Sequence, residues 1–140
     1  MSQVSWAAAP DGRYWIDILV GSRPLRFLID LGLIDPAHAV GLEVEPHVFD
    51  SLKQAGDLVG AGARAWRDAS GRLHSVASGW ARVQLMDPAT ASRVGPSVRL
   101  FLTRGFPAVP NRVGVVFFHR LSGCSVLWQL DQRRWCFDIP

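Results

Sequence analysis

The sequence predicts an all-β or mainly β protein with a single core. Thirteen Gly and nine Pro, against two Glu and one Lys, argue against a helical bundle and favour short strands joined by turns. Hydrophobic residues make up 49% of the chain and charged residues 19%, which excludes a disordered chain. The length of 140 residues leaves no room for a second core of ordinary size. We therefore expect an N-terminal segment, 1–12, followed by one β domain, 13–140.

The first strong element is a hairpin. Residues 14–20 and 25–30 are rich in β-branched and aromatic side chains, and the turn-forming stretch 21–24 separates them. The second strand is almost entirely apolar and stops at Asp30. A carboxylate that ends a buried strand is costly unless it is paired, solvated or used. Asp30 is therefore the most informative residue of the chain.

A short strand and a helix follow. The stretch Leu42-Glu43-Val44-Glu45 alternates as a half-buried strand does, and Pro46 suits the first position of a helix. The apolar residues between Val48 and Ala55 recur at helical spacing and stop before Gly56, which predicts one amphipathic helix over about 46–55. Its apolar stripe fits the core, and a partner-binding helix is the alternative.

Residues 58–85 predict a long irregular hairpin. Gly60-Ala61-Gly62 opens it, residues 68–71 form a turn, and the second strand is interrupted at Gly79. The spacing of Gly60, Gly62 and Ala65 superficially matches the dinucleotide-binding fingerprint. That fingerprint needs a strand before it and a helix after it. The sequence offers neither, so we reject a nucleotide site.

The C-terminal part contains another strand, 98–102, an apolar run, 113–118, and a closing hairpin. If Gln132-Arg133 form its turn, apolar residues oppose one another along one face, and Cys136 faces Gln129. The opposed pairs in this register are Leu130 with Trp135, Trp128 with Phe137, and Val126 with Ile139. We therefore predict that Cys136 forms no disulfide with Cys124.

Composition also limits the partners and cofactors. The net charge is only +3, and fourteen arginines are scattered singly among acidic and apolar residues, so we expect no nucleic-acid partner. The four histidines and two cysteines have no metal-ligand spacing, so we expect no metal and no cofactor. The longest apolar run is far too short to span a membrane. The first ten residues lack the features of a secretory signal, which predicts a cytoplasmic protein.

Taken in order, the elements from residue 14 to residue 139 resemble the retropepsin-like aspartic peptidases, the single-lobe relatives of pepsin. The stretch Phe27-Leu28-Ile29-Asp30-Leu31-Gly32 lies where that family has apolar-apolar-Asp-Thr/Ser-Gly. The strand at 42–46 with the helix after it, and the hairpin at 60–83, look like the family's next strand and helix and its flap. The run 113–121 looks like the apolar-Gly-x-x-Phe-Leu segment before the closing strands.

The resemblance implies a closed β-barrel with a flap at about 58–85 and one short helix, assembled as a two-fold homodimer. It implies an endopeptidase that cleaves a polypeptide substrate with Asp30 of both copies and an activated water, without a cofactor. Gly32 would allow the tight turn that brings the two Asp30 loops together. Gly60, Gly62 and Trp66 would line the flap side of the substrate. For Trp66, a surface side chain packed on an arginine is the alternative.

Position 31 departs from the family pattern, because Leu31 stands where the family has Thr or Ser. Family members use that hydroxyl in a hydrogen-bond network that braces the two loops across the dimer. The sequence therefore leaves two further hypotheses beside the peptidase. One is a catalytically inactive retropepsin-like barrel that serves as a dimerisation or peptide-binding module. The other is an unrelated small β-barrel with an aspartate at the edge of its core.

Overall fold

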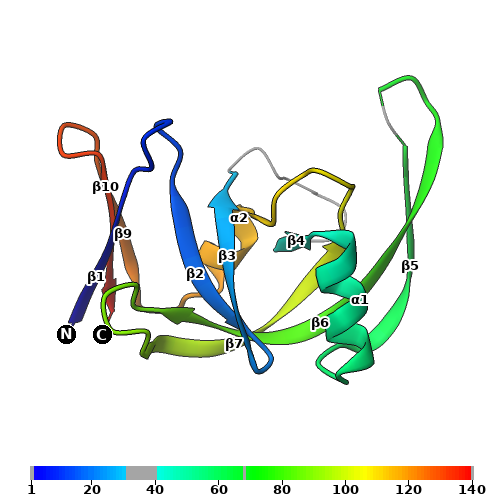
Figure 1. Ribbon diagram of the computed structural model, residues 1–140, viewed down its shortest axis with the longest axis horizontal. Helices are drawn as coiled ribbons and strands as arrows, with labels where there is room; N and C mark the ends of the chain where they lie inside the picture. The colour runs from blue at the N-terminus through cyan, green and yellow to red at the C-terminus, as the bar shows by residue number, and fades with distance from the viewer. Residues whose placement is uncertain (1, 31–40, 68, 140) are drawn as a thin grey trace.

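Two β-sheets make up the fold (Figure 1). The computed structural model describes residues 2–30, 41–67 and 69–139. The larger sheet contains β2 (Trp15–Val20), β3 (Arg23–Ile29), β4 (Leu42–Val44), β5 (Val59–Arg67), β6 (Leu73–Met86), β7 (Arg93–Arg104) and β8 (Arg112–Val113). The smaller sheet contains β1 (Ser2–Ala7), β9 (Ser125–Gln129) and β10 (Arg134–Ile139). The mainly β class predicted from the composition is confirmed.

The larger sheet has the strand order β2-β3-β8-β4-β7-β6-β5. Strand β2 also pairs with β6, so the first strand of this order is hydrogen-bonded to the sixth. The two short strands β4 and β8 lie in the middle: β8 runs parallel to β3 and antiparallel to β4. This topology places β3, β8 and β4, which are distant in sequence, side by side.

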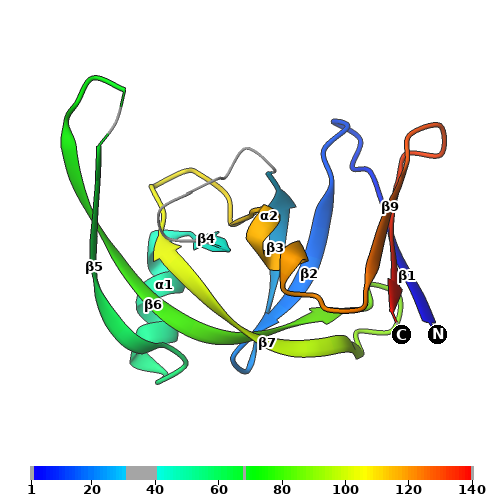
Figure 2. The ribbon, with the colours of Figure 1, turned by 180° about the vertical axis from the view of Figure 1, so that it is seen from behind.

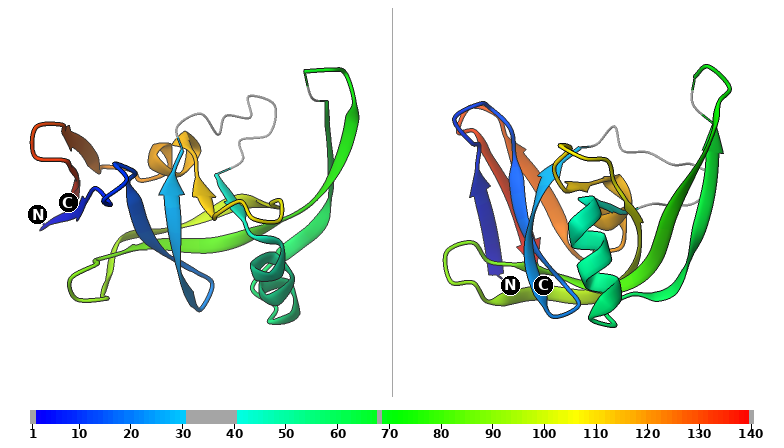
Figure 3. Two further views of the ribbon diagram at one scale, coloured as in Figure 1. Left: turned by 45° about the horizontal axis from the view of Figure 1, so that its top comes forward. Right: turned by 45° about the vertical axis from the view of Figure 1, so that its right-hand side comes forward.

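The predicted long hairpin is formed by β5 and β6. The two strands are antiparallel, and their pairing runs from Val59 opposite Trp80 to Arg67 opposite Leu73. Its outer end stands clear of the other strands (Figure 3). The register shifts between Val59 and Gly62, and Gly60 adopts φ +63°, which glycine takes at no steric cost. The irregularity expected from the Gly60-Ala61-Gly62 stretch is therefore a β-bulge.

The predicted helix is α1 (Pro46–Gln54), and it begins with Pro46 as expected. Its buried side chains, Val48, Phe49 and Leu52, belong to the hydrophobic core, so its apolar stripe serves core packing. A second helix, α2 (Val115–His119), corrects the expectation of one short helix. It follows β8, the strand that pairs with β3, and Figures 1 and 2 show it next to β3 in projection. An apolar run as short as 115–118 fits a buried strand or a buried helix equally well, so periodicity could not identify it.

The smaller sheet has the order β1-β10-β9, and β1 pairs antiparallel with β10 over all six of its residues. This differs from the expected division of the chain at residue 13, because the segment 1–12 contributes a strand. Val4 and Trp6 are buried in the core, and the Trp6 ring meets that of Phe137 edge to face at 5.6 Å. The N-terminal residues are thus packed into the same domain as the rest.

The closing hairpin corrects the predicted register by two residues. Trp135 opposes Trp128 and Phe137 opposes Val126, because residues 130–133 form the connection and Arg133 adopts φ 50°. A shift of two residues keeps every side chain on its predicted face. Cys136 therefore opposes Leu127 instead of Gln129, and both Cys124 and Cys136 are free. None of the helices in the described part of the chain is long and apolar enough to span a membrane.

Candidate active site

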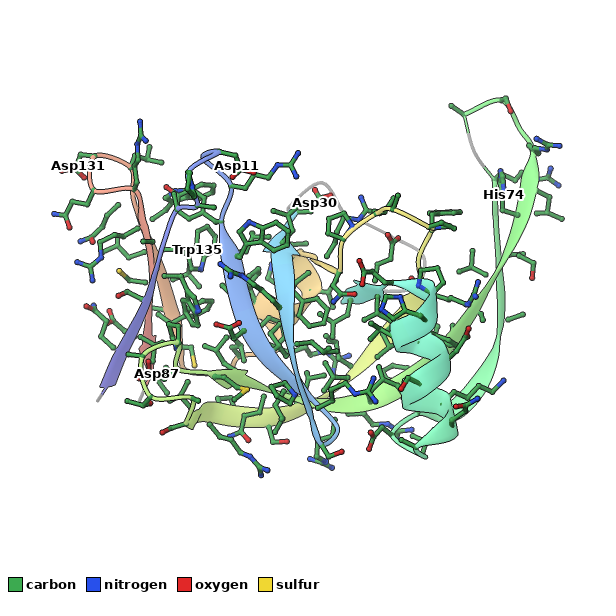
Figure 4. The ribbon with its side chains drawn as sticks, in the orientation of Figure 1. Asp11, Asp30, His74, Asp87, Asp131 and Trp135 are labelled. Carbon is green, nitrogen blue, oxygen red and sulfur yellow. The ribbon has the colours of Figure 1, made fainter. Side chains whose placement is uncertain are left out.

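Asp30 lies directly after β3, a strand that buries Phe27 and leaves its other side chains partly or fully exposed (Figure 4). Phe27 is fully buried, whereas the Asp30 side chain is 32% exposed. The parallel pairing of β3 with β8 fixes the backbone here, since the Asp30 N–H donates a hydrogen bond to the Val113 carbonyl at 3.0 Å. The carboxylate is therefore held on a rigid strand end with access to water.

The Asp30 carboxylate forms an ion pair with Arg112 of β8. Nη1 of Arg112 donates a hydrogen bond to Oδ2 of Asp30 at 3.0 Å. The opposite edge of the same guanidinium faces Glu43 of β4: Nη2 and Nε donate to Oε1 of Glu43 at 2.6 and 3.1 Å. One arginine thus joins two carboxylates that come from two different strands.

Strand register explains why these three residues meet. Arg112 is directly opposite Glu43 in the antiparallel β4–β8 pair and beside Leu28 in the parallel β3–β8 pair. The Glu43 side chain is only 11% exposed. A carboxylate buried to that degree is costly unless a cation and hydrogen bonds compensate it, and Arg112 supplies both. With Asp30, Glu43 and Arg112 all ionised, the cluster carries a net charge of −1.

A hollow of about 490 Å³ opens beside Asp30 and Arg112. We call it the Asp30 hollow. Its walls are mostly apolar and aromatic, and Trp128 of β9 meets the Tyr14 ring edge to face at 5.1 Å. The lining residues are Gly12, Arg13, Tyr14, Leu28, Ile29, Asp30, Pro110, Arg112 and Trp128. Such a hollow, apolar with a few convergent charged groups, is typical of a ligand or substrate site.

The other residues proposed from the sequence fall into two groups. Leu31 and Gly32 lie outside the described residues. Gly60, Gly62 and Trp66 are all on β5, where Trp66 is opposite His74. In Figure 4 His74 stands far to one side of Asp30, near the outer end of the hairpin. Gly60 and Gly62 are not among the residues that line the Asp30 hollow, and the role of the predicted flap residues toward a substrate stays a prediction.

Sequence reasoning missed Arg112 and Glu43. Glu43 carries a weak signal, because it stands between two apolar residues of a strand that is buried throughout. Arg112 directly precedes a buried apolar run, which gives it no signal of its own. The β4–β8 pairing that joins them spans 69 residues of sequence, so only the tertiary structure reveals the pair.

The described residues contain no group of three or more His, Cys, Asp or Glu side chains that could hold a metal ion. Cys124 is partly buried, which raises the pKa of its thiol above the ordinary value. That shift disfavours the reactive thiolate. The Asp30 hollow is distinguished by the ion-paired carboxylate and guanidinium on its wall, Asp30 and Arg112.

The fold is similar to that of a retropepsin-like aspartic protease from Rickettsia conorii, with a TM-score of 0.61. The match covers 99% of this chain and 91% of that chain, at 14% sequence identity. No protein-family model matches the sequence, and no curated protein matches it. The retropepsin-like resemblance is therefore confirmed at the level of the fold. This likeness argues against the hypothesis of an unrelated small β-barrel.

Proposed function

We propose that this protein is an aspartic endopeptidase that acts as a homodimer, with Asp30 of each copy forming the catalytic pair. The observation that carries the proposal is the position of Asp30. In a retropepsin-like fold it directly follows β3, is about one-third exposed and lines a mostly apolar hollow. A chain of one lobe offers one such carboxylate, so a second copy must supply the other.

The chemistry follows from placing two carboxyl groups close together. At about 3 Å the two groups share one proton, because like charges that close cannot both ionise. The ionised group takes a proton from a water, whose oxygen attacks the scissile carbonyl carbon, while the protonated group donates to the carbonyl oxygen. The C–N bond of the tetrahedral intermediate then breaks: the leaving amine takes the proton that the first carboxyl removed from water, and the second carboxyl recovers its proton from the hydroxyl as the carbonyl re-forms. An extended polypeptide suits such a site, since it can add strand-type hydrogen bonds.

Strand β9 supports the dimer. It is an edge strand of the smaller sheet, and its apolar side chains are exposed on both faces, with Leu127 at 50% and Leu130 just beyond it at 72%. Exposed apolar edge strands pair with another chain unless something blocks them. Trp128 of this strand also lines the Asp30 hollow. A second copy seated on β9 would therefore lie next to Asp30.

The test of catalysis compares wild type with Asp30→Asn on an unfolded polypeptide between about pH 3 and 7. We expect wild type to cleave and the variant to lose more than about 1,000-fold in kcat/KM, because the general base is gone. Arg104→Met, which removes an exposed ion pair between two residues that do not line the hollow, is the control and keeps full activity. Cleavage that persists in Asp30→Asn would contradict the proposed mechanism.

The test of assembly uses sedimentation equilibrium. Leu127→Glu places a charge on the exposed edge of β9, so we expect a monomer without activity. Leu73→Glu is the matched control, because Leu73 is also an exposed leucine but belongs to β6, and it should remain dimeric. A wild-type protein that stays monomeric at working concentration would rule out the catalytic pair.

A peptide-binding or dimerisation module without proteolysis is the second candidate. The observation that favours it is the ion pair itself, because Arg112 already engages Oδ2 of Asp30, and Leu31 lacks the hydroxyl expected beside it. Under this hypothesis an unfolded polypeptide binds the dimer and is recovered intact after long incubation. Binding without cleavage by wild type would favour the module over the peptidase.

A further inference from the structure

Arg112 is anchored far more firmly than an ordinary surface arginine. Its backbone belongs to β8, which lies between β3 and β4 in the larger sheet. Its side chain is 26% exposed and uses both edges of the guanidinium, one on Asp30 and one on Glu43. An arginine held along two edges loses most of its rotational freedom, and a planar guanidinium then fixes the direction of each hydrogen bond.

The Glu43 side chain occupies the space beside Gly105. A Cβ atom built on Gly105 would lie 2.9 Å from the Val44 carbonyl oxygen and 3.1 Å from Cγ of Glu43. The missing side chain at Gly105 is thus what leaves room for the Glu43 carboxylate. A side chain at this position would displace the carboxylate that anchors Arg112.

The hydrogen bonds in the cluster favour the view that Arg112 orients Asp30 over the view that it blocks Asp30. Glu43 accepts two hydrogen bonds from the guanidinium, the shorter at 2.6 Å, whereas Asp30 accepts one at 3.0 Å. Two of these three hydrogen bonds from Arg112 therefore go to Glu43, and the third goes to Oδ2 of Asp30. This one hydrogen bond orients Oδ2 of Asp30, and it leaves most of the hydrogen-bonding capacity of the guanidinium with Glu43.

We infer that Arg112, anchored by Glu43, is a positioning residue that orients the Asp30 carboxylate for its reaction. This inference rests on the proposed function. The resemblance implies a hydroxyl at the following position that braces the two loops across the dimer, and Leu31 has no hydrogen-bond donor in its side chain. Arg112 supplies a donor from within the same chain, through β8 instead of through the loop that follows Asp30.

Peptidase kinetics test the role. Because small misplacements of a reacting group cost about 100-fold, we expect Arg112→Met to lower kcat by about 10–100-fold with little change in KM. Glu43→Gln should lower kcat in the same way, since it loosens the anchor without touching Asp30. Leu31→Thr introduced into Arg112→Met should recover part of kcat, because it restores a donor beside Asp30. Arg104→Met is again the control.

Arg112→Met leaves Glu43 buried without its cation, so the double variant Arg112→Met/Glu43→Gln guards against unfolding. It should fold as wild type does by circular dichroism and still show the reduced kcat. A kcat equal to or above that of wild type in this folded double variant would overturn the inference. An increase would mean that Arg112 obstructs Asp30.

Nuclear magnetic resonance gives a readout that does not depend on activity. A guanidinium held along both edges rotates slowly about Nε–Cζ, so Arg112 should give two separate Nη signals in wild type. These signals should merge in Glu43→Gln and stay separate in Arg104→Met. Merged Arg112 signals in wild type would overturn the inference even where peptide is cleaved. A wild-type protein that shows separate Arg112 signals but cleaves no peptide would overturn the proposed function. It would also overturn the role of Arg112 in orienting Asp30 for catalysis.

Discussion

Two arginine–carboxylate pairs in this protein use the same chemical groups in different surroundings. Arg104 donates from Nε and Nη2 to the two oxygens of Asp50 at 3.1 and 3.2 Å, and the two side chains are 41% and 54% exposed. Arg112 joins Glu43 and Asp30 at similar distances, but both of its partners are more buried. The first pair links β7 to α1, and the second links three strands of one sheet.

The difference shows that the geometry of an ion pair does not by itself measure its importance. Water screens the Arg104–Asp50 pair, and ordering two long exposed side chains opposes the attraction. Glu43 has already lost most of its hydration, so the loss of its cation leaves a costly buried charge. The buried cluster should therefore matter for both stability and function, and the exposed pair for little of either.

The largest expected difference is in the free energy of unfolding. Arg112→Met should reduce it by about 2–4 kcal/mol, because breaking a buried ion pair leaves one charge uncompensated and Arg112 keeps some contact with water. Arg104→Met should change it far less. Denaturant unfolding at pH 7, followed by circular dichroism, measures both. Equal losses in the two variants would show that burial does not separate the two pairs.

A double-mutant cycle sharpens the comparison. Glu43→Gln should cost less in the Arg112→Met background than in wild type, with a coupling of about 1–3 kcal/mol. The cycle of Arg104→Met with Asp50→Asn should be close to additive, because those side chains are solvated. The same unfolding experiment measures both cycles. Additivity between Arg112 and Glu43 would contradict the account of a buried, compensated carboxylate.

Local patterns in the sequence were sufficient for most of the fold. The alternation before Pro46 and the helical spacing after it predicted β4 and α1, and the turn residues predicted the β2–β3 and β5–β6 hairpins. The missed elements had no local pattern. The segment before residue 13 forms a strand because β10 is available to pair with it, and the run 115–118 becomes helical where Phe117 enters the core.

The candidate site was predictable to the extent that it rests on one residue. Asp30 was found because a carboxylate at the end of an apolar strand is costly, and that cost can be read locally. Glu43 and Arg112 make sense only as a pair, and the pair exists because β8 lies between β3 and β4. Sequence alone gives no reason to place β8 there. The register of the closing hairpin failed for a related reason, since the conformation of Arg133 decides the turn.

A smaller effect is expected at Gly105, which follows Arg104 in the chain and lies beside the Glu43 side chain. Gly105→Ala should reduce the free energy of unfolding by about 1–2 kcal/mol, because its Cβ would crowd the Val44 carbonyl and displace the Glu43 carboxylate. Gly62→Ala is the matched control, since nothing lies within 4 Å of a Cβ there. Thermal unfolding of both variants measures the difference. If Gly105→Ala were as stable as Gly62→Ala, Glu43 would have room to move and the anchor would be loose.

The smallest expected effect is the change in the unfolding midpoint when the pH is lowered through the titration of Asp50 in the exposed Arg104–Asp50 pair. Hydrogen bonds from Arg104 hold the pKa of the Asp50 carboxyl below its ordinary value of 3.8. A carboxyl whose pKa is lower in the folded state stabilises the protein above the pKa of the unfolded state, and this contribution fades as the pH falls through the folded value. The difference in unfolding midpoint between wild type and Asp50→Asn should therefore be small at pH 7 and vanish near pH 2. A difference that grows as the pH falls would mean that Asp50 is stabilised in its protonated form, which the contacts with Arg104 oppose.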